Sequence, residues 1–178
     1  MSCSTNPLTV VSFPSALGWL AALWSQDKLV WLTIAHASPS AAIRALPGGR
    51  QATGPTETTH ESLAERLQAY CEGMRVDFAD VPLDIDGLST FQYRVARRCR
   101  QIPYGETITY GQLAARAGSP DAARAVGNAM ARNRFPLIVP CHRVVGSGGS
   151  LGGFSAPSGV QLKRRLLEME QGAAQPAN

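Results

Sequence analysis

The chain of 178 residues is poor in cysteine and has no long hydrophobic run. Its four cysteines, Cys3, Cys71, Cys99 and Cys141, lie far apart, which excludes the dense disulfide framework of a small secreted protein and predicts a reducing compartment. The apolar stretch from Ala16 to Trp24 is far shorter than the roughly 20 residues that cross a bilayer, and no signal peptide opens the chain. We therefore expect no membrane role.

The sequence also lacks the closely spaced ligand pairs of a metal site. No Cys-x-x-Cys or His-x-x-x-His pair occurs, so a zinc ion would need ligands from distant segments. We predict no metal site, although a structural zinc built from such distant ligands stays open.

Charge is distributed unevenly along the chain. Residues 1–87 contain 5 Lys and Arg against 9 Asp and Glu, whereas residues 88–178 contain 12 against 4. The length allows one large domain or two small ones, and the segment from Val81 to Gly87, with its proline and aspartates, is typical of a passage into a second domain. A basic second half is typical of a protein that binds a polyanion, with nucleic acid as the simplest choice.

The first half reads as a small antiparallel sheet with helices. Leu8 to Phe13, Leu17 to Trp24 and Lys28 to His36 are rich in β-branched and aromatic residues, and a short polar turn makes a hairpin of the last two. Ser38-Pro39 predicts the start of one helix, and Thr58 with Glu61 the start of another. This half is therefore predicted to be an α/β domain.

The second half is predicted to be mainly helical because its helix starts are well marked. Three capping boxes, each a Ser or Thr followed by Gln three residues later, begin at Ser89, Thr109 and Ser158. A fourth helix is expected to open at Ser119-Pro120. In the first helix Cys99 falls on the apolar stripe, so we expect that cysteine to lie in the core.

Two of these helices have the spacing of a helix-turn-helix. They run from about Tyr110 to Ala117 and from Pro120 to Asn133, and only Gly118-Ser119 separates them. Such a pair can be a DNA-binding motif or a plain packing unit. The composition of the second helix favours DNA, because polar side chains and small residues share one side where a partner can approach closely. This predicted DNA-binding surface comprises Ala123, Arg124, Gly127, Asn128 and Arg132.

The segment from Pro140 to Val144 carries the best candidate for a reactive side chain. It places Cys141 directly beside His142 and Arg143. Positive or protonatable neighbours stabilise a thiolate, lower the pKa of the thiol and activate it as a nucleophile. Read alone, the same segment also fits a buried structural cysteine, because free cysteine is among the most buried residue types.

Taken together, these motifs resemble the O6-alkylguanine-DNA alkyltransferases. The resemblance covers about residues 88 to 171 closely, and its motifs follow in the order of the family. They are Ile102 to Ala114 (IPYGETITYGQLA), Ala122 to Gly127 (AARAVG), Asn133, and Pro140 to Val144 (PCHRV).

The resemblance implies a two-domain protein that repairs alkylated DNA. Residues 1–87 would form an RNase H-like α/β domain and residues 88–178 a winged helix-turn-helix domain. The alkyl group would pass irreversibly from O6 of guanine, with O4 of thymine left open, to the protein. The partner would be double-stranded DNA containing O6-alkylguanine, without any cofactor. We expect a monomer that can cluster on DNA, in a bacterial cytosol or nucleoid or in a eukaryotic nucleus.

The same resemblance implies roles for eight residues. Cys141 matches the alkyl acceptor, His142 the base that acts on it through a water, and Glu170 the carboxylate that orients the histidine, with Glu168 as the neighbouring alternative. Asn133 matches the residue that supports the cysteine turn.

The other four matches concern DNA and the flipped base. Arg124 matches the finger that enters the duplex through the minor groove, and Tyr110 the tyrosine that pushes the 3′ phosphate and assists base rotation, with its hydroxyl also a candidate proton donor in catalysis. Val144 and Ser155 match contacts to the everted guanine. The chain departs from the family at Phe154, where many relatives have tyrosine, and in the longer loop that follows.

Two other classes of protein remain as alternatives. A Cys-His hydrolase would use Cys141 and His142, but it needs an oxyanion hole and leaves the helix-turn-helix unexplained. A lesion-binding protein of the alkyltransferase-like type would share Arg124 and Tyr110 but lack the acceptor thiol, so the presence of Cys141 argues against it.

Overall fold

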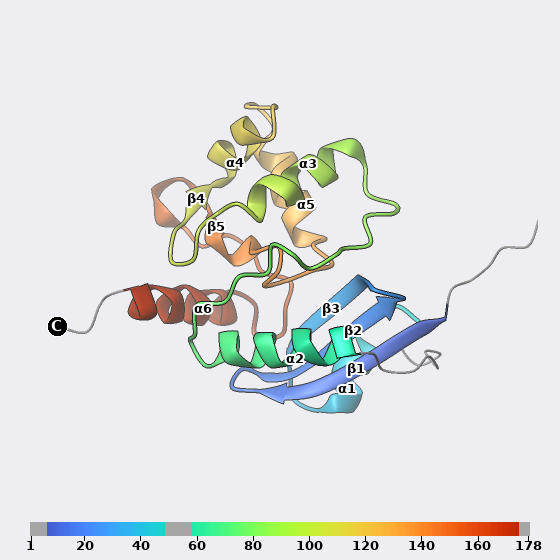
Figure 1. The fold of residues 1–178 in the computed structure, drawn as a ribbon. Helices are drawn as coiled ribbons and strands as arrows, with labels where there is room; N and C mark the ends of the chain where they lie inside the picture. The colour runs from blue at the N-terminus through green and yellow to red at the C-terminus, as the bar shows by residue number, and fades with distance from the viewer. Residues whose placement is uncertain (1–6, 49–57, 175–178) are drawn as a thin grey trace, which may run out of the picture. The chain divides into compact units, whose positions relative to one another are not determined.

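The chain forms two compact units, residues 1–84 and 85–178, in a computed structural model that describes residues 7–48 and 58–174 (Figure 1). The first unit combines a three-stranded sheet with helices, and the second is mainly helical. This confirms the predicted fold class. None of the described helices is long and apolar enough to cross a membrane.

The sheet of the first unit is antiparallel, with strand order β1-β2-β3. Its strands are β1 (Leu8–Ser15), β2 (Gly18–Ser25) and β3 (Lys28–His36). Ser25 pairs with Lys28, so β2 and β3 form the predicted hairpin through a two-residue turn.

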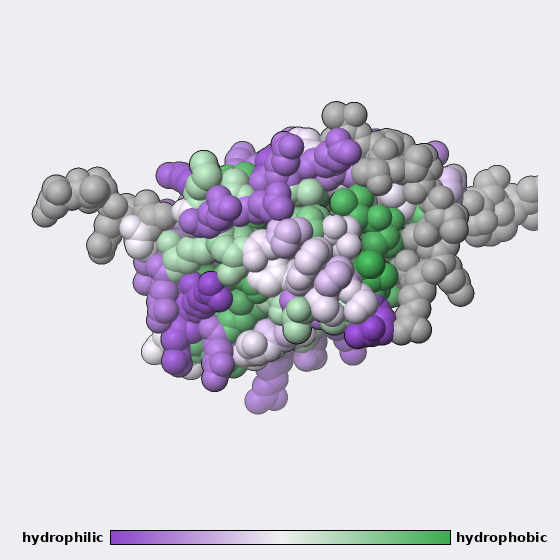
Figure 2. Space-filling model, turned by 90° about the horizontal axis from the view of Figure 1, so that it is seen from below, coloured by the Kyte–Doolittle hydropathy of each residue, from purple (hydrophilic) through white to green (hydrophobic). Residues whose placement is uncertain are grey.

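One face of the sheet packs against the short helix α1 (Pro39–Arg44). The hydroxyl of Ser38 accepts a hydrogen bond from the amide of Ala41, so the predicted N-cap is present. Ala21 and Leu23, which alternate along β2, are buried here in a cluster with residues of α1. Figure 2, which looks from below, shows hydrophobic and hydrophilic residues side by side at the surface.

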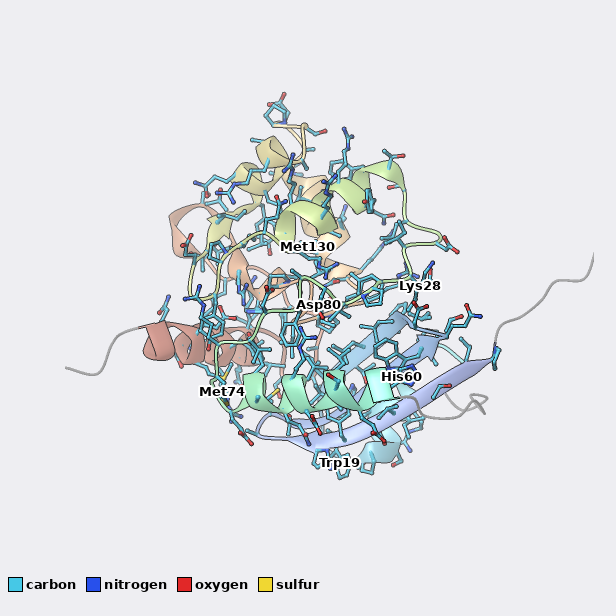
Figure 3. The ribbon with its side chains drawn as sticks, in the orientation of Figure 1. Trp19, Lys28, His60, Met74, Asp80 and Met130 are labelled. Carbon is cyan, nitrogen blue, oxygen red and sulfur yellow. The ribbon has the colours of Figure 1, made fainter. Side chains whose placement is uncertain are left out.

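The opposite face of the sheet meets helix α2 (Thr58–Cys71). Trp24 of β2 points to this face, and the ring of His60 stacks on it with 4.3 Å between centroids. Figure 3 labels His60 on α2. Further along α2, Leu67 and Tyr70 share one face of the helix and are fully buried. Together these contacts make the core of the first unit.

The first two helices of the second unit begin where the capping boxes predict. Helix α3 (Thr90–Cys99) is capped by Ser89 and helix α4 (Tyr110–Arg116) by Thr109, and both boxes are closed by the glutamine three residues later. Cys99 is fully buried, which confirms its place in the core.

Helix α5 (Ala123–Ala131) is shorter than the predicted 120–133. The chain makes a turn first, in which the amide of Ala122 donates to the carbonyl of Ser119. Ala122 then precedes the helix without a side-chain cap. The expectation of a helix opening at Ser119-Pro120 was therefore wrong, because this turn occupies the positions that the helix would take.

The rest of the second unit comes together around a short parallel ladder that the sequence did not predict. Strand β4 (Ile108–Thr109) pairs with β5 (Val144–Val145). The remaining elements are η2 (Cys141–Arg143), η3 (Ser147–Gly149) and α6 (Gly159–Ala174).

Helix α6 begins one residue after its predicted cap but without the expected capping box conformation. Ser158 has φ of 65°, in the left-handed region, whereas Ser89 and Thr109 are extended. The amide of Gln161 donates to the carbonyl oxygen of Ser158. The turn before α6 is therefore built from the backbone.

Candidate active site

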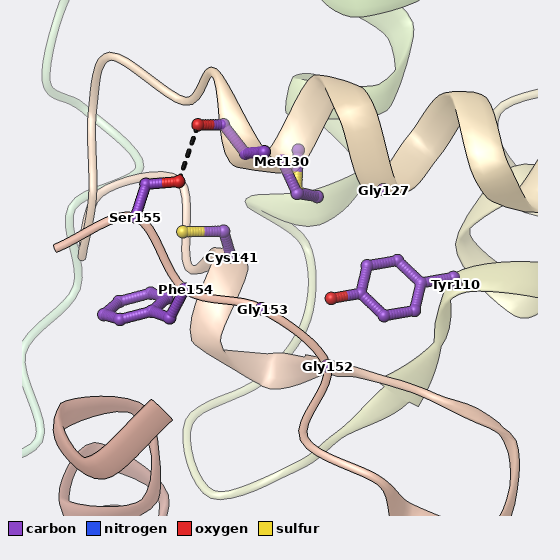
Figure 4. Close-up of a pocket in the computed structure, with 9 residues that line it drawn as sticks. Tyr110, Gly127, Met130, Cys141, Gly152, Gly153, Phe154 and Ser155 are labelled. Carbon is purple, nitrogen blue, oxygen red and sulfur yellow. Dashed lines mark hydrogen bonds between the residues drawn. The ribbon is translucent and has the colours of Figure 1, made fainter. Parts of the chain in front are cut away.

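A cavity of about 510 Å³ in the second unit contains Cys141 in its wall (Figure 4). One side of this cavity is the end of α5, and the other is the loop that follows η3. Its lining residues are Tyr110, Gly127, Met130, Ala131, Cys141, Gly152, Gly153, Phe154 and Ser155. Cys141 is only 7% exposed, so a group that reaches its sulfur must enter this cavity.

Asn133 holds the turn that presents Cys141. Its Nδ2 donates to the carbonyl of Val139 at 2.8 Å and lies 3.2 Å from the sulfur of Cys141. Its Oδ1 accepts from the amide of Phe135. One amide side chain thus fixes the segment before the cysteine and also contacts the sulfur, as expected of a residue that supports this turn.

The electrostatics of Cys141 differ from the sequence expectation. Burial raises the pKa of the Cys141 thiol, while the hydrogen bond from Asn133 and the charge of Lys163 act in the opposite direction. Arg143, which was expected to stabilise a thiolate, turns toward Glu170 instead. The thiol therefore keeps its proton until a base removes it.

His142 and Glu170 supply such a base and its partner. Nε2 of His142 lies 2.9 Å from Oε1 of Glu170, and both side chains are fully buried. Burial alone would raise the pKa of Glu170, but hydrogen bonds from His142 and Arg143 hold this pKa at about 2. The structure distinguishes Glu170 from Glu168, which is exposed on α6.

Two buried cations near the site were not predicted as site residues. Arg143 is 7% exposed and Lys163 is 1% exposed. Nζ of Lys163 donates to the carbonyl of Val144 at 2.6 Å and lies 3.5 Å from the Tyr110 hydroxyl. The sequence carries a signal for Lys163, because Leu166 and Glu170 follow at the spacing of one helical face.

Tyr110 projects into the cavity from the first turn of α4 (Figure 4). Burial raises the pKa of its hydroxyl, and so does the nearby Cys141. The hydroxyl also lies close to the backbone of Gly152, where a Cβ would come within 2.9 Å of it. The tyrosine is thus a protonated hydroxyl held against the loop.

The two residues expected to contact guanine are placed differently. Ser155 lines the cavity, and its hydroxyl donates to the carbonyl of Ala131 at 2.8 Å, which joins the loop to the end of α5. Val144 is fully buried, does not line the cavity, and its carbonyl accepts from Lys163. Phe154 provides an apolar wall where a tyrosine would bring a hydroxyl.

Helix α5 turns its polar side chains outward beside this cavity. Arg124, Asn128 and Arg132 are exposed, whereas Val126 is buried. Ala123 is half-buried at the start of the helix, and Gly127 lines the cavity. The predicted DNA-binding surface therefore faces solvent and reaches the wall that contains Cys141.

The described residues contain no group of three or more His, Cys, Asp or Glu side chains that could hold a metal ion. Cys71, Cys99 and Cys141 are free thiols.

Residues 90–172 match a protein-family model described as 6-O-methylguanine DNA methyltransferase, DNA binding domain. A methylated-DNA--protein-cysteine methyltransferase of Methanothermobacter thermautotrophicus is 44% identical over 110 residues, which are 62% of this chain and 60% of that protein. A protein of the same name from Mycobacterium bovis is 44% identical over 120 residues, 67% of this chain and 70% of that protein.

The fold is also similar to solved structures. Mycobacterium tuberculosis OGT, solved in complex with DNA, is 36% identical and has a TM-score of 0.77. The alignment covers 93% of this chain and 94% of that one. The likeness therefore extends over both units, although the match to the Methanothermobacter protein covers less than two thirds of its length.

Proposed function

Because this chain belongs to the methylated-DNA--protein-cysteine methyltransferase family, we propose that it repairs alkylated DNA by moving the alkyl group from O6 of guanine to Cys141. One observation carries this proposal. The same cavity is lined by the candidate nucleophile and by Gly127 and Ala131 of the helix that bears the DNA-binding surface. A base that enters beside this helix comes directly to the sulfur.

Access to the sulfur requires that the nucleotide leave the duplex. The alkyl group sits on a base edge within the stack, and extrusion of a nucleotide costs a few kcal/mol, less for a poorly paired lesion. Arg124, exposed near the start of α5, is the side chain proposed to occupy the place that the base leaves. Phosphate contacts then supply affinity without sequence preference, which suits a search for damage at any position.

The transfer itself balances as a displacement at carbon. The proton of the Cys141 thiol passes to His142, whose other ring nitrogen is held by Glu170. The sulfur electron pair forms the new C–S bond as the C–O6 bond breaks, and the electrons of that bond remain on guanine. The departing guanine takes a proton from the Tyr110 hydroxyl in the cavity wall, and the proton that His142 took then restores that hydroxyl, so that both side chains end as they began.

The product explains why each molecule acts once. The alkylated cysteine is a thioether, which has no electrophilic carbonyl that water can attack. Among the described residues no second thiol lines the cavity, since Cys71 and Cys99 are buried elsewhere. The protein is consumed stoichiometrically.

The proposed partner is double-stranded DNA that contains O6-alkylguanine, bound by a monomer that can cluster on DNA. The basic residues 88–178 and the exposed arginines of α5 support a polyanionic partner. The protein would act wherever the chromosome lies, in a bacterial cytosol or nucleoid or in a nucleus.

A mass-spectrometric transfer assay tests the proposal. Incubation with duplex DNA containing O6-methylguanine should add one methyl group to the tryptic peptide 135–143, in proportion to protein. Cys141→Ser should abolish the gain and still bind DNA, because only the acceptor changes. Arg124→Ala should slow transfer from duplex more than transfer from free O6-benzylguanine, with Arg164→Ala on the exposed side of α6 as the control. Binding of DNA without any gain in mass would instead support a lesion-binding protein.

A further inference from the structure

We propose that Arg143 is a positioning residue for alkyl transfer, which neutralises Glu170 so that His142 keeps one unprotonated ring nitrogen for the proton of Cys141. This inference rests on the proposed function. It assigns a task to a buried cation that the transfer reaction does not otherwise use.

The guanidinium of Arg143 is fixed on three sides. Its Nε lies 3.0 Å from Oε2 of Glu170, and its Nη2 lies 2.8 Å from Oε1, so the pair is bidentate. Nη1 donates to the carbonyl of Ile102 at 2.7 Å. The ring of Tyr104 lies 5.6 Å from the guanidinium carbon. A side chain held in this way has no freedom to reach the sulfur of Cys141.

The carboxylate of Glu170 is surrounded by donors. Besides Arg143 it accepts from Nε2 of His142 at 2.9 Å and from the backbone amide of Gly105 at 3.1 Å. These donors keep the carboxylate ionised although it is fully buried. An ionised carboxylate can only accept hydrogen bonds.

The state of His142 follows from this. Since Glu170 only accepts, Nε2 of His142 must carry a proton, and in the neutral ring Nδ1 is then the nitrogen with a lone pair. A second proton on the ring would create an imidazolium. Burial lowers the pKa of His142, Glu170 raises it, and the charges of Arg143 and Lys163 lower it again.

Among the contributions to the pKa of His142, the charge of Arg143 is the one that a single substitution can remove by itself. The charged groups that act on His142 are Glu170 and Lys163 from α6 and Arg143 from its own turn. Without Arg143, the negative charge of Glu170 would be left to His142, and a buried carboxylate would favour the imidazolium form. The imidazolium has no lone pair, so it cannot take the thiol proton.

The test compares the pH dependence of transfer in Arg143→Met, Arg143→Lys and the control Arg164→Met. Free O6-benzylguanine is the substrate, so that DNA binding does not enter. In the wild type, activity should be lost only below the ordinary titration range of histidine. In Arg143→Met this acid limb should move to higher pH, with transfer at a fixed pH on the limb slower by about tenfold for each pKa unit of the shift. Arg143→Lys, which keeps the charge, should keep the limb near its wild-type position.

A purely structural role for Arg143 gives a different result. Arg143→Met would then transfer more slowly at every pH, with the limb unmoved, and the proposal would be overturned. If Arg143→Met is unstable, the double variant Arg143→Met and Glu170→Gln is compared with the wild type instead. It removes both buried charges, so neither is left in the core without its partner.

A second measurement needs no substrate. The ring protons of His142, followed by NMR in the full chain, should titrate at higher pH in Arg143→Met than in the wild type. An unchanged titration would refute the inference even if transfer occurs. If the wild type never gained an alkyl group, the proposed function would be refuted. The NMR titration would still test the effect of Arg143 on His142, because it needs no substrate.

Discussion

At the scale of single residues, the contact between Gly152 and Tyr110 sets the geometry of the cavity. Gly152 has φ of +65°, and a Cβ there would lie 2.9 Å from the Tyr110 hydroxyl. Both residues line the cavity that contains Cys141. The glycine is therefore required twice, once by its backbone conformation and once by the hydroxyl that it faces.

We predict that Gly152→Ala will slow alkyl transfer by about tenfold or more. The methyl group must push the Tyr110 hydroxyl away from its place, and the left-handed backbone adds about 1 kcal/mol of strain. DNA affinity should change little, because the α5 surface is untouched. Transfer rates and DNA binding, measured for the same samples, check both parts.

Gly153→Ala is the matched control for this prediction. Gly153 lines the same cavity, but a Cβ there would meet no atom within 4 Å, and its φ is not in the left-handed region. It should keep a transfer rate near that of the wild type. Equal losses in the two variants would show that the loop tolerates no side chain anywhere, contrary to the specific contact with Tyr110.

Patterns in the sequence identified the residues at the centre of the site better than the contacts that surround them. Cys141 next to His142 is a local pattern, so the sequence alone could single it out. The direction in which Arg143 points depends on Glu170, which is 27 residues away, and no local pattern contains it. The upward shift in the pKa of Cys141 has the same origin, since burial is a property of the folded unit.

At the scale of elements, helix α5 combines an exposed polar side with a glycine in its middle. A Cβ at Gly127 would meet no atom within 4 Å, so packing within the protein does not require this glycine. Glycine in a helix interior is destabilising by about 0.5–1 kcal/mol relative to alanine. The absence of a side chain is then best explained by a partner that approaches the helix.

We predict that Gly127→Ala will have opposite effects on stability and on DNA repair. The free energy of unfolding should rise by about 0.5–1 kcal/mol, because alanine favours the helix. Affinity for duplex DNA should fall, because the methyl group occupies space that the duplex needs. Chemical denaturation and a duplex-binding titration measure the two effects.

Ala125→Gly on the same helix gives the reverse comparison. Ala125 is exposed and does not line the Cys141 cavity, so its replacement should lower stability by a similar amount. Transfer from free O6-benzylguanine should be unaffected in Ala125→Gly, because Ala125 does not line the cavity. If Gly127→Ala bound duplex DNA as well as the wild type, the close approach to α5 would be refuted.

Local sequence rules worked for elements where side chains cap the backbone. The boxes at Ser89 and Thr109 are closed as predicted, since both partners lie within four residues. The rules failed at Pro120, where a turn precedes α5. They also missed the pairing of β4 with β5, because two strands of two residues have no periodicity to detect.

At the scale of the whole molecule, charge separates along the chain. Residues 88–178 carry 12 Lys and Arg against 4 Asp and Glu, and residues 1–87 carry 5 against 9. Neutralisation of phosphates by such a basic segment releases counterions, so affinity for duplex DNA must fall as salt rises. Transfer from a free, uncharged base has no such dependence.

We predict that replacing Arg124 and Arg132 by alanine will reduce the salt dependence of duplex binding. Each phosphate contact contributes about −0.9 to the slope of log K against log salt, so the slope should become shallower by about 2. Cys141→Ser serves as the background so that binding is measured without reaction. Binding isotherms of undamaged duplex at several salt concentrations give the slopes.

The control removes the same charge from the other unit. Lys28 and Arg44 are exposed residues of the first unit, and their replacement by alanine should leave the slope within error of the parent. Equal changes in the two double variants would mean that net charge alone, rather than the α5 surface, governs binding.

Glu170 lies 28 residues after the histidine that it orients, and Lys163 lies on the same final helix. The carboxylate that orients the base is therefore synthesised after the reactive thiol, the base itself and the whole DNA-reading motif. A chain cut short between Ser155 and Leu162 would lose this carboxylate together with buried residues of α6 such as Leu162 and Leu166, so the second unit would lose part of its core as well as the partner of His142.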